Sequence, residues 1–550
     1  MESSDTLQLE LPSRSLNSLS FCPDGSEPNN NKLEQWLNGL SLTDHQQTGA
    51  HLVNALDELS RLDCPPDELF ALAEAIRSPS LSTAASSYQR HLKQYITFES
   101  SQQGWFDLCK RLYMGLANLY KAVVQCCLDN NNANILAAAL HRAISESAAA
   151  YLFHCLLYRP APERLWLEMH TLYQLAISHN HQGFQQEDPY DKSRPMSLEN
   201  LYKRVLMLSR SDTNKLSPGE IQQVWQILSL WISHSKIQPR SGLKTYFAAS
   251  LNSDEGLEYA LPEPDKAHSG VIGLNIRVLT AQLEKIKSDP KTARVLPAEL
   301  IKHLISSWGP IQKRSSPRRT SSDQCEICSG FTGLHYHLSG KRSFEDIIAL
   351  HSDATGKSRF SEQSDDVWSQ AHDAEIRDED KQSSPSAGEI ITFNTEQFLD
   401  NKRFSALPAE IINTSHTGFC LKISSKLPKQ FHAGELIGIC ENKVSPWALY
   451  SVRWLGISTQ NEVTIGANFI ATSVEPVAIS LIHKTQEASH FQRSLMLTDS
   501  SEATLIMPNL TGKEGAKFEL IQNDTLLKGQ LMSCINTTPT WCQYQFKLFG

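Results

Sequence analysis

Two short patterns, far apart in the chain, carry residue types that can hold a ligand through its charges and its hydrogen-bonding edges. The first is Arg314-Ser-Ser-Pro-Arg318 with Arg319 directly after it, and the second is Asn413-Thr-Ser415-His-Thr-Gly418. Guanidinium groups bind phosphate oxygens in pairs and stack on flat rings, and Asn and Ser side chains exchange hydrogen bonds. Gly418 allows a positive φ or a close backbone approach. Taken alone, an Asn-x-Ser-x-x-Gly string is a common turn, and a basic run is more often a solvated linker.

A possible metal site overlaps the region after the basic run, where Cys325-Glu-Ile-Cys328 is followed by His335 and His337. Two thiolates and two imidazoles can complete a tetrahedral zinc site. The spacing differs from that of a standard zinc finger, because a single residue separates the two histidines. On an extended strand the two cysteines also point to opposite faces, because their separation is odd. We interpret them as core thiols on a strand and keep zinc as an alternative.

Motifs that indicate catalysis are missing from the sequence. It contains no G-x-x-x-x-G-K-[ST] phosphate loop, no G-x-G-x-x-G after a strand, no H-E-x-x-H and no G-x-S-x-G elbow. The acidic cluster from Asp373 to Asp380 supplies carboxylates, but its segment is poorly suited to holding fixed geometry. Histidines such as His141, His154 and His170 lie among apolar neighbours on predicted helices and are expected to be buried and hydrogen-bonded. We therefore predict that the protein is not an enzyme and carries no metal or other cofactor.

The first part of the chain is predicted to be helical. Residues 1–32 are rich in Ser, Asn, Pro and Asp and lack an apolar period, which predicts a disordered leader. Residues 33–240 show helix-length segments with 3.6-residue periodicity, separated by breakers such as Cys64-Pro-Pro66. Within them, four residues have the spacing of the first helix of a tetratricopeptide repeat: Trp166, Met169, His170 and Tyr173. A repeat-like array and an irregular bundle both stay open.

Residues 241–312 are predicted to form a mixed connecting region. Apolar residues alternate on both sides of the turn 252–256, which indicates two strands. Two helical segments follow, from about residue 275 to residue 288 and from residue 298 to residue 308.

The second half of the chain is predicted to be mainly β-structure. A strand-like run at Gln324–Phe331 precedes an acidic, nearly aliphatic-free segment at 352–388, which predicts a disordered insert. Short strand-like runs then recur up to Val477–Ile482, at intervals of about 8 to 12 residues. Together they predict an antiparallel β-barrel over 313–482, followed by a further β module at 489–550. The predicted fold class is multidomain α+β, with an N-terminal all-α helical array or bundle before the barrel and the C-terminal β module.

The runs around the Asn413–Gly418 turn resemble the PilZ family. The turn lies between two strand-like runs and is followed by Phe419-Cys-Leu421. Further on, Val452-Arg-Trp454-Leu455 and Ile465-Gly466-Ala-Asn-Phe469 resemble the later strands of that family, in which a Trp-containing strand pairs with a Gly-x-x-Phe strand. The resemblance covers residues 405 to about 482 and implies a PilZ-like antiparallel barrel.

The resemblance also implies a ligand, the bacterial second messenger cyclic di-GMP. Members of the family carry an Arg-x-x-x-Arg motif just before the first strand, and Arg314–Arg318 matches it at a larger distance from the turn than is usual. The acidic segment would then be an insertion between the first two strands. A cyclic dinucleotide offers phosphodiesters and guanine edges that suit guanidinium, amide and hydroxyl groups. By resemblance, the residues expected to contact the ligand are Arg314, Arg318, Arg319, Asn413, Ser415 and Gly418.

Composition limits the partners and the compartment. With 51 Lys and Arg against 60 Asp and Glu, the formal charge is −9, so the chain has no overall basic field for DNA. No stretch has the roughly 18 apolar residues that span a membrane, and the first residues do not resemble a signal peptide. Twelve cysteines in 550 residues are too sparse for a disulfide framework. We expect a cytoplasmic protein with reduced thiols, no DNA partner and no membrane span.

These observations predict a protein of signal transduction. It would receive cyclic di-GMP at a PilZ-like barrel and pass the signal, through its helical region, to an unidentified protein partner. The first alternative is a PilZ-like scaffold or adaptor that binds no nucleotide. The second is a zinc- or RNA-binding module around Cys325–His337.

Overall fold

The computed structural model divides the chain into two compact units. The first holds residues 1–213 and 218–313, and the second holds residues 314–550 with the short segment 214–217. The structure describes residues 9–21, 30–41, 43–130, 132–190, 195–239, 247–259, 270–288, 296–310, 317–349, 404, 406–429, 431–442, 445–482, 490–499, 502–509 and 512–549. The acidic segment 352–388 lies outside the described residues. Among the described helices, none has both the length and the hydropathy that crossing a bilayer requires.

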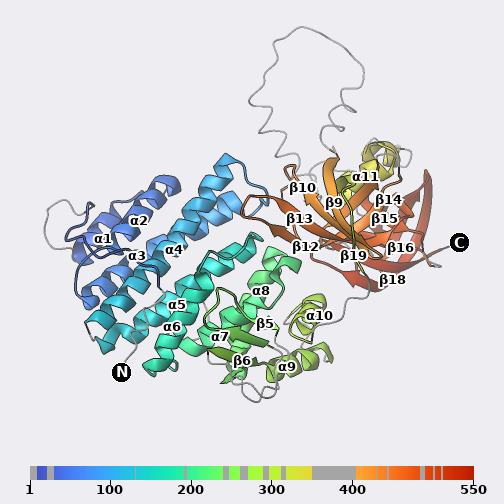
Figure 1. Ribbon diagram of the computed structural model, residues 1–550. Coiled ribbons are helices and arrows are strands. Elements are labelled where there is room, and N and C mark those ends of the chain that lie inside the picture. Colours follow the sequence, from blue (N-terminus) through green and yellow to red (C-terminus); the bar gives the residue numbers. More distant parts are fainter. Residues whose placement is uncertain are drawn as a thin grey trace, which may run out of the picture. The chain divides into compact units, whose positions relative to one another are not determined.

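The first unit begins with a set of packed helices, drawn in blue to green in Figure 1. They are α1 (Asn30–Asn38), α2 (His45–Leu59), α3 (Pro66–Ser87), α4 (Ser100–Asp129), α5 (Ala133–Leu156), α6 (Leu165–Ser178), α7 (Leu198–Ser209) and α8 (Pro218–Trp231). The predicted breakers fall between helices, and α3 begins at Pro66, the position where a missing N–H costs no helical hydrogen bond. The helical N-terminal region is therefore confirmed.

Helices α4 and α5 form the centre of this packing. A capping box between Glu99 and Gln102 begins α4, and its buried residues recur every three or four positions, as at Phe106 and Cys109. The Asn132 side chain accepts a hydrogen bond from the Asn134 backbone N–H and so caps the start of α5. The two helices run side by side over most of their length (Figure 1).

The expectation of a disordered leader is wrong for residues 9–21. Leu16 forms a parallel bridge with Leu62, Leu19 is buried, and the Arg14 guanidinium lies 2.8 Å from Asp63. This segment is held by backbone hydrogen bonds to the loop after α2 and by isolated apolar side chains. Neither feature creates a periodic pattern, which is why composition alone favoured disorder.

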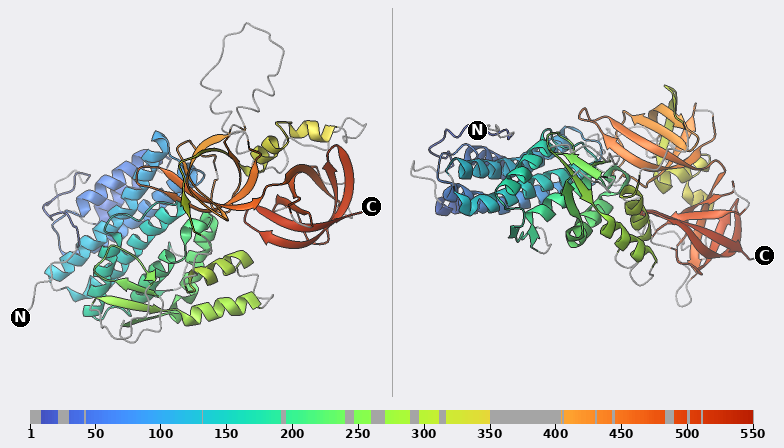
Figure 2. Two further views of the ribbon diagram at one scale, coloured as in Figure 1. Left: turned by 45° about the vertical axis from the view of Figure 1, so that its right-hand side comes forward. Right: turned by 60° about the horizontal axis from the view of Figure 1, so that its bottom comes forward.

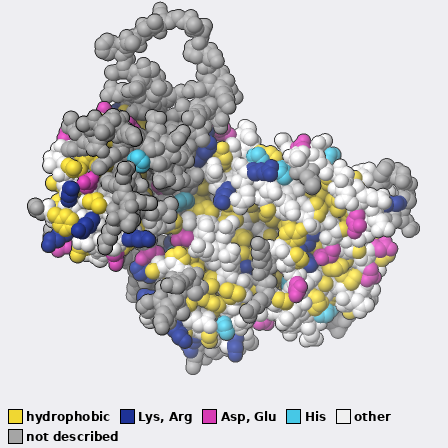
Figure 3. Space-filling model, turned by 180° about the vertical axis from the view of Figure 1, so that it is seen from behind, with side chains coloured by type: hydrophobic (Ala, Val, Ile, Leu, Met, Phe, Trp, Pro, Cys, Tyr) yellow, Lys and Arg dark blue, Asp and Glu magenta, His cyan; other side chains and the backbone are white. Residues whose placement is uncertain are grey.

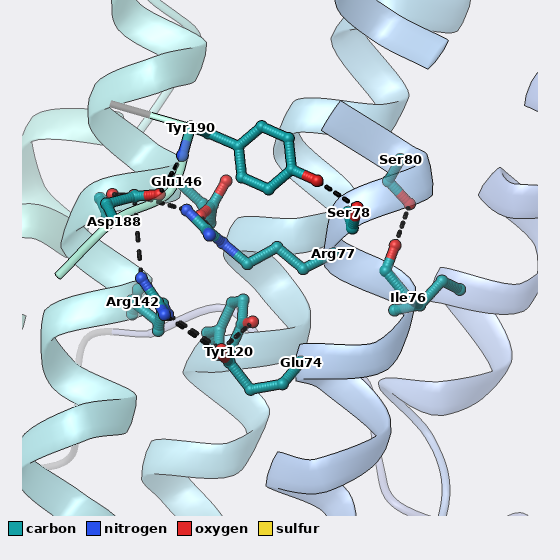
Figure 4. A network of polar contacts seen from close by, with 12 residues as sticks. Glu74, Ile76, Arg77, Ser78, Ser80, Tyr120, Arg142, Glu146, Asp188 and Tyr190 are labelled. Carbon is teal, nitrogen blue, oxygen red and sulfur yellow. Dashed lines mark hydrogen bonds and ion pairs between the residues drawn. The ribbon is translucent and has the colours of Figure 1, made fainter. Parts of the chain in front are cut away.

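A buried polar network joins three of these helices to the segment before α7 (Figure 4). Arg77 of α3 donates to Glu146 of α5 at 2.7 Å and to Asp188 at 2.6 Å. Arg142 of α5 pairs with Glu74 at 2.9 Å. The two guanidinium groups and Glu146 are almost completely buried, so each charge needs its partner.

The three singled-out histidines are buried and hydrogen-bonded, as expected. His141 Nε2 contacts the Met196 carbonyl at 3.0 Å, and His154 Nδ1 contacts the Pro160 carbonyl at 2.6 Å. His170 Nδ1 lies 2.6 Å from the Tyr202 hydroxyl. His170 belongs to α6, and the next elements are the strands β1 (Gln185–Gln186) and β2 (Met196–Ser197) rather than a second helix. In this respect α6 departs from a tetratricopeptide hairpin.

The last part of the first unit is mixed, as predicted for the connecting region. Its four-stranded sheet has the order β3-β6-β4-β5. The strands are β3 (Lys236–Pro239), β4 (Phe247–Ser250), β5 (Glu258–Tyr259) and β6 (Val271–Asn275), and the helices α9 (Arg277–Ser288) and α10 (Ala298–Ser307) follow. The expected strand pair around the 252–256 turn is present, with Phe247 opposite Tyr259.

The second unit contains two antiparallel barrels, drawn in orange and red in Figures 1 and 2. Around the first, the neighbouring strands run in the order β8-β9-β10-β13-β12-β11 and back to β8. They are β8 (Gln324–Ser329), β9 (Leu407–Ser415), β10 (Gly418–Ile423), β11 (Leu436–Glu441), β12 (Ala448–Ile457) and β13 (Val463–Ala471). The interior holds apolar side chains such as Leu421, Leu455 and Ile465, none of them exposed. The predicted antiparallel barrel is thereby confirmed.

The second barrel confirms the further β module and corrects one strand assignment. It closes in the order β14-β15-β16-β19-β18-β17. Its strands are β14 (Val474–Ile482), β15 (Gln492–Leu497), β16 (Thr504–Pro508), β17 (Lys517–Gln522), β18 (Thr525–Thr537) and β19 (Trp541–Leu548). The strand at Val477–Ile482, which we assigned to the first barrel, belongs to the second. It follows β13 after a two-residue turn, and spacing alone could not show that its hydrogen-bonding partners change there.

Two short helices follow β8 in this unit, and the first of them contacts both barrels. Helix α11 (Gly330–Leu338) follows β8, so the strand predicted up to Phe331 ends at Ser329, and α12 (Phe344–Ile348) comes next. Phe331 and Leu334 of α11 pack in one cluster with Leu436 of the first barrel and Trp541 of the second. The two barrels thus share a hydrophobic core around α11.

Candidate functional site

The Asn413–Gly418 pattern forms the tight turn between β9 and β10. Ser415 pairs with Gly418, and only His416 and Thr417 lie between them. The Ser415 hydroxyl donates a hydrogen bond to the Gly418 carbonyl at 3.2 Å. The Thr417 carbonyl accepts from the Phe469 backbone N–H at 2.9 Å, which fixes the turn against β13. The local sequence therefore places Asn413 and Ser415 at one end of a rigid hairpin.

Gly418 is required by close backbone packing. Its φ is +153°, and a Cβ at this position would overlap the backbone oxygen of Ala467 on β13. Because the obstacle is backbone, no side-chain rotation can relieve it. The glycine of the pattern thus serves the contact between β10 and β13.

The arginine segment reaches the same turn through strand pairing. Strand β7 (Arg319–Thr320) pairs with β9, with Arg319 opposite Thr414 and Thr320 opposite Asn413. The chain stays beside β9, because Ser321 donates to the Ile412 carbonyl, and then continues as β8. The structure thus brings Arg319 next to the turn. Arg314 lies outside the described residues.

The Arg318 charge and the Asn413 amide converge on Cys420, which lies opposite Asn413 on β10. Burial raises the pKa of the Cys420 thiol, while the Arg318 guanidinium and a hydrogen bond with the Asn413 side chain act in the opposite direction. Arg318 directly precedes β7, whose Thr320 pairs with Asn413, so the strand register also brings the two patterns side by side. The two sequence patterns therefore meet in one place.

The site is basic at this end. Arg318 and Arg319 are exposed, and neither forms an ion pair within the part of the chain that the structure describes. Lys422, further along β10, is paired with Glu462 at 2.5 Å. The guanidinium groups are thus the cations available to an anionic ligand here. Elsewhere, charges of both signs are interspersed on the face shown in Figure 3.

Strand register adds residues that sequence reasoning did not assign to the site. Cys420 pairs with Gly466 on β13, and Gly466 pairs with Trp454 on β12. One row further along, Gly418 pairs with Asn468. The Trp454–Gly466 pairing confirms the expected match of a Trp-containing strand with a Gly-x-x-Phe strand. The two motifs were visible in the sequence. Their position in one row with Asn413 depends on the pairing of β9 with β10, of β10 with β13 and of β13 with β12.

The proposed zinc ligands do not come together. Cys325 and Cys328 lie on β8, whereas His335 and His337 lie on α11. His335 Nε2 contacts the Val477 carbonyl at 3.2 Å, and His337 Nε2 contacts the Phe404 carbonyl at 2.7 Å. Burial lowers the pKa of His335 to about 3. Among the described residues, no group of three His, Cys, Asp or Glu side chains has the arrangement of a metal site.

Comparison with known proteins gives matches along nearly the whole chain. Three family models match in chain order. The cyclic-di-GMP receptor FimW, N-terminal domain, matches residues 31–241, the FimW middle PilZ domain matches residues 246–476, and the FimW C-terminal β-barrel domain matches residues 477–549. The last boundary falls within β14. The first two of these names describe a cyclic-di-GMP receptor.

One full-length relative and the strand topology agree with these matches. The cyclic-di-GMP receptor FimW of Pseudomonas aeruginosa is 27% identical over 574 residues, which cover 98% of this chain and 93% of the relative. No solved structure matches. The first barrel has the predicted strand pairing and the Asn-x-Ser-x-x-Gly turn. From these findings we conclude that the chain belongs to the PilZ domain family, in the three-domain arrangement that the FimW models describe.

Proposed function

We propose that the protein is a receptor that binds cyclic di-GMP on the first barrel and passes the signal to a protein partner through its helical unit. The observation that carries the proposal is the register of β7 against β9, which sets Arg319 opposite Thr414. It joins the arginine pattern to the Asn413–Gly418 turn. The name of the matched relative, a cyclic-di-GMP receptor, supports this choice of ligand.

The residue types suit the chemistry of that ligand. Arg318 and Arg319 are exposed cations that can bind phosphodiester oxygens or the O6 and N7 atoms of guanine, and Arg314 adds a third guanidinium in the sequence. The Asn413 amide can donate to or accept from a base edge. Ser415 already donates to the Gly418 carbonyl, so its hydroxyl oxygen is the group left to accept from the ligand.

The segment that carries the arginines is suited to respond to a ligand. Residues 317–320 are exposed, and β7 is held by only two residue pairs with β9. A ligand that bridges this segment and the turn would stabilise the paired arrangement over a detached one. Only such a difference in affinity between two arrangements can drive a signal. The helical unit would present the change to the partner, in the cytoplasm.

Isothermal titration of the full-length protein with cyclic di-GMP tests this proposal. The variants are Arg314→Ala/Arg318→Ala and Asn413→Ala/Ser415→Ala. The matched control is Arg342→Ala, because Arg342 is also a half-exposed arginine of this unit but pairs with Asp524 of the second barrel. We expect saturable binding by the wild type and the control, and a loss of about 10-fold or more in each double variant.

Two other outcomes have distinct meanings. If only the Asn413/Ser415 variant lost binding, Arg314 and Arg318 would not be the cations that bind the ligand. No binding by the wild-type protein would overturn the receptor proposal and leave the alternative of a PilZ-like scaffold that contacts only proteins.

A further inference from the structure

The last hairpin of the second barrel carries two cysteines whose side chains lie on the same face. In the pairing of β18 with β19, Thr537 lies opposite Cys542 and Cys534 lies opposite Tyr544. Residues opposite one another in antiparallel strands point to the same face, and so do residues two apart on one strand. Cys534 and Cys542 are therefore diagonal neighbours. Cys542 belongs to the hydrophobic core of this barrel, and Cys534 packs against that core.

A β-bulge creates this arrangement. Within these two described strands, the register passes over Ile535, which has no residue opposite it on β19. Without this extra residue, Cys534 would lie opposite Gln545 and would point to the other face of the sheet from Cys542. The bulge thus turns Cys534 toward the second cysteine.

The two sulfur atoms meet around one hydroxyl group. Cys534 Sγ lies 3.1 Å from Oγ1 of Thr537, and Cys542 Sγ lies 3.7 Å from the same oxygen. Burial raises the pKa of the Cys542 thiol, and a hydrogen bond with the Cys534 side chain acts in the same direction. Two thiols that share a face and a contact atom are placed for a bond between their sulfur atoms.

The two thiols differ in their access to solvent. Cys534 is half-buried and lies between the exposed residues Ser533 and Ile535. Cys542 is only 3% exposed and donates a hydrogen bond to Oδ1 of Asn509 at 2.8 Å. A small oxidant therefore reaches Cys534 more easily than Cys542. An accessible thiol beside a protected one is the arrangement of a reactive cysteine with its resolving partner.

We propose that Cys534 and Cys542 form a dithiol site that hydroperoxides oxidise to a disulfide within the β18–β19 hairpin. The Cys534 thiolate attacks one oxygen of the hydroperoxide and the O–O bond breaks. Water or an alcohol leaves with the proton of the thiol, and Cys534 becomes a sulfenic acid. Cys542 then attacks this sulfur, so that the S–S bond forms, the S–O bond breaks and the hydroxide leaves with the Cys542 proton as water. The two sulfurs give up two electrons, which the hydroperoxide takes up.

The dithiol site lies beside a contact between the two barrels and does not rest on the proposed function. Trp541 directly precedes Cys542, and its Nε1–H donates to the Gly434 carbonyl of the first barrel at 2.9 Å. A bond at Cys542 would therefore hold the end of the strand that carries this contact. The inference adds an oxidant-sensitive site to a chain in which the thiols are otherwise expected to stay reduced.

Peptide mapping of the full-length protein tests the proposal. The reduced protein is treated with hydrogen peroxide, alkylated with iodoacetamide and cut with trypsin. Both cysteines fall in one tryptic peptide, 529–547, because no Lys or Arg lies between Lys528 and Lys547. We expect this peptide to become lighter by two hydrogen atoms and to take up no iodoacetamide. Dithiothreitol before alkylation should restore two labels, because a disulfide is reversible and a sulfinic acid is not.

Two variants define the roles of the thiols. Cys542→Ser lacks the resolving thiol, so Cys534 should stop at the sulfenic acid, which dimedone traps. The matched control is Cys64→Ala, because Cys64 is the other half-buried cysteine of the described residues. We expect the disulfide in peptide 529–547 to form in this control as it does in the wild type.

Three results in the wild-type protein would overturn the proposal. They are two alkyl labels on peptide 529–547 after peroxide, a sulfinic acid at Cys534 without a crosslink, and a crosslink from Cys534 to another peptide or another chain. Because the wild type carries no substitution, none of these results can be attributed to misfolding. They would also leave the proposed function untouched, since that is measured by titration with cyclic di-GMP.

Discussion

Arg319 lies opposite Thr414 across the pairing of β7 with β9, although the whole of β8, α11 and α12 comes between them in the chain. The pairing continues beside β9 through Ser321 into β8, so the arginines are placed by the first strand of the barrel itself. Because loop-closure entropy grows slowly with length, a long connection between β8 and β9 is compatible with this register. The distance in sequence between the two patterns therefore does not prevent them from forming one site.

Replacement of Gly418 by alanine should destabilise the second unit. The new Cβ would overlap the backbone oxygen of Ala467, and the φ of +153° disfavours any side chain. We expect a loss of about 2 kcal/mol in the free energy of unfolding, seen as a lower transition temperature in calorimetry of the full chain. Gly456→Ala is the control, since a Cβ there meets nothing within 4 Å. Equal transition temperatures for the two variants would contradict the close-packing explanation.

The contact between Gly466 and Trp454 predicts an energetic coupling. Gly466→Ala places a methyl group where the indole lies, so it should cost about 1 to 3 kcal/mol. In a Trp454→Ala background the same change has room and should cost less. A double-mutant cycle on thermal or denaturant unfolding measures this coupling. Additive effects of the two substitutions would show that the indole does not cover Gly466.

Glu435 should make the stability of the second unit depend on pH. Its side chain is 3% exposed, and its Oε2 atom has no hydrogen-bond partner among the described residues. Burial raises its pKa from 4.5 to about 8. His432 Nε2 is 4.0 Å away, too far for a hydrogen bond. The folded protein therefore keeps this carboxyl protonated in a pH range where the unfolded chain releases the proton.

The sign of the effect follows from that proton. Below pH 4.5 the Glu435 carboxyl is protonated in both the folded and the unfolded protein. Between pH 4.5 and 8 only the folded protein keeps the proton, so the free energy of unfolding falls by up to about 1.4 kcal/mol per pH unit. Glu435→Gln removes this loss, so its stability advantage over the wild type should grow from pH 5.5 to pH 7.5 by about 2 kcal/mol. Glu441→Gln, at the exposed end of β11, the strand that begins directly after Glu435, is the control. A constant difference between wild type and Glu435→Gln at the two pH values would refute the prediction.

Removal of Arg77 should strongly destabilise the helical unit. Arg77→Met leaves Glu146 and Asp188 buried without the guanidinium that both contact. The expected cost is about 3 to 5 kcal/mol, because an unpaired buried charge is expensive. Arg111→Ala, which breaks the exposed pair with Asp57, should cost less than about 1 kcal/mol. If calorimetry gave both variants the same small shift, the buried network would not be important for stability.

Sequence reasoning predicted features encoded over short stretches. The helices, the connecting strands and the Asn413–Gly418 turn follow from local periodicity and turn chemistry, and the structure confirms these elements. The roles of Asn413, Ser415 and Arg318 in contacting a ligand stay predictions. Arg318 could be placed near the turn only by treating Gln324 onward as the first barrel strand, and the pairing of β8 with β9 confirms that choice.

What the sequence missed depends on contacts between distant residues. Trp454 and Asn468 reach the site through register, and periodicity does not specify which strand a given strand pairs with. For the same reason, the sequence could not show that the strand at Val477–Ile482 pairs within the second barrel. Leu16 and Leu19 are too few to make a pattern, so neither the bridge of Leu16 with Leu62 nor the burial of Leu19 was predicted.

Hydrogen exchange of the full-length protein with and without cyclic di-GMP tests the central claim most directly, since it locates the ligand without any substitution. The account predicts that the ligand slows amide exchange simultaneously in peptides that contain Arg318–Thr320 and in peptides that contain His416–Gly418, because the two segments form one site. Protection of only one of them, or protection confined to the second barrel or the helical unit, would contradict it.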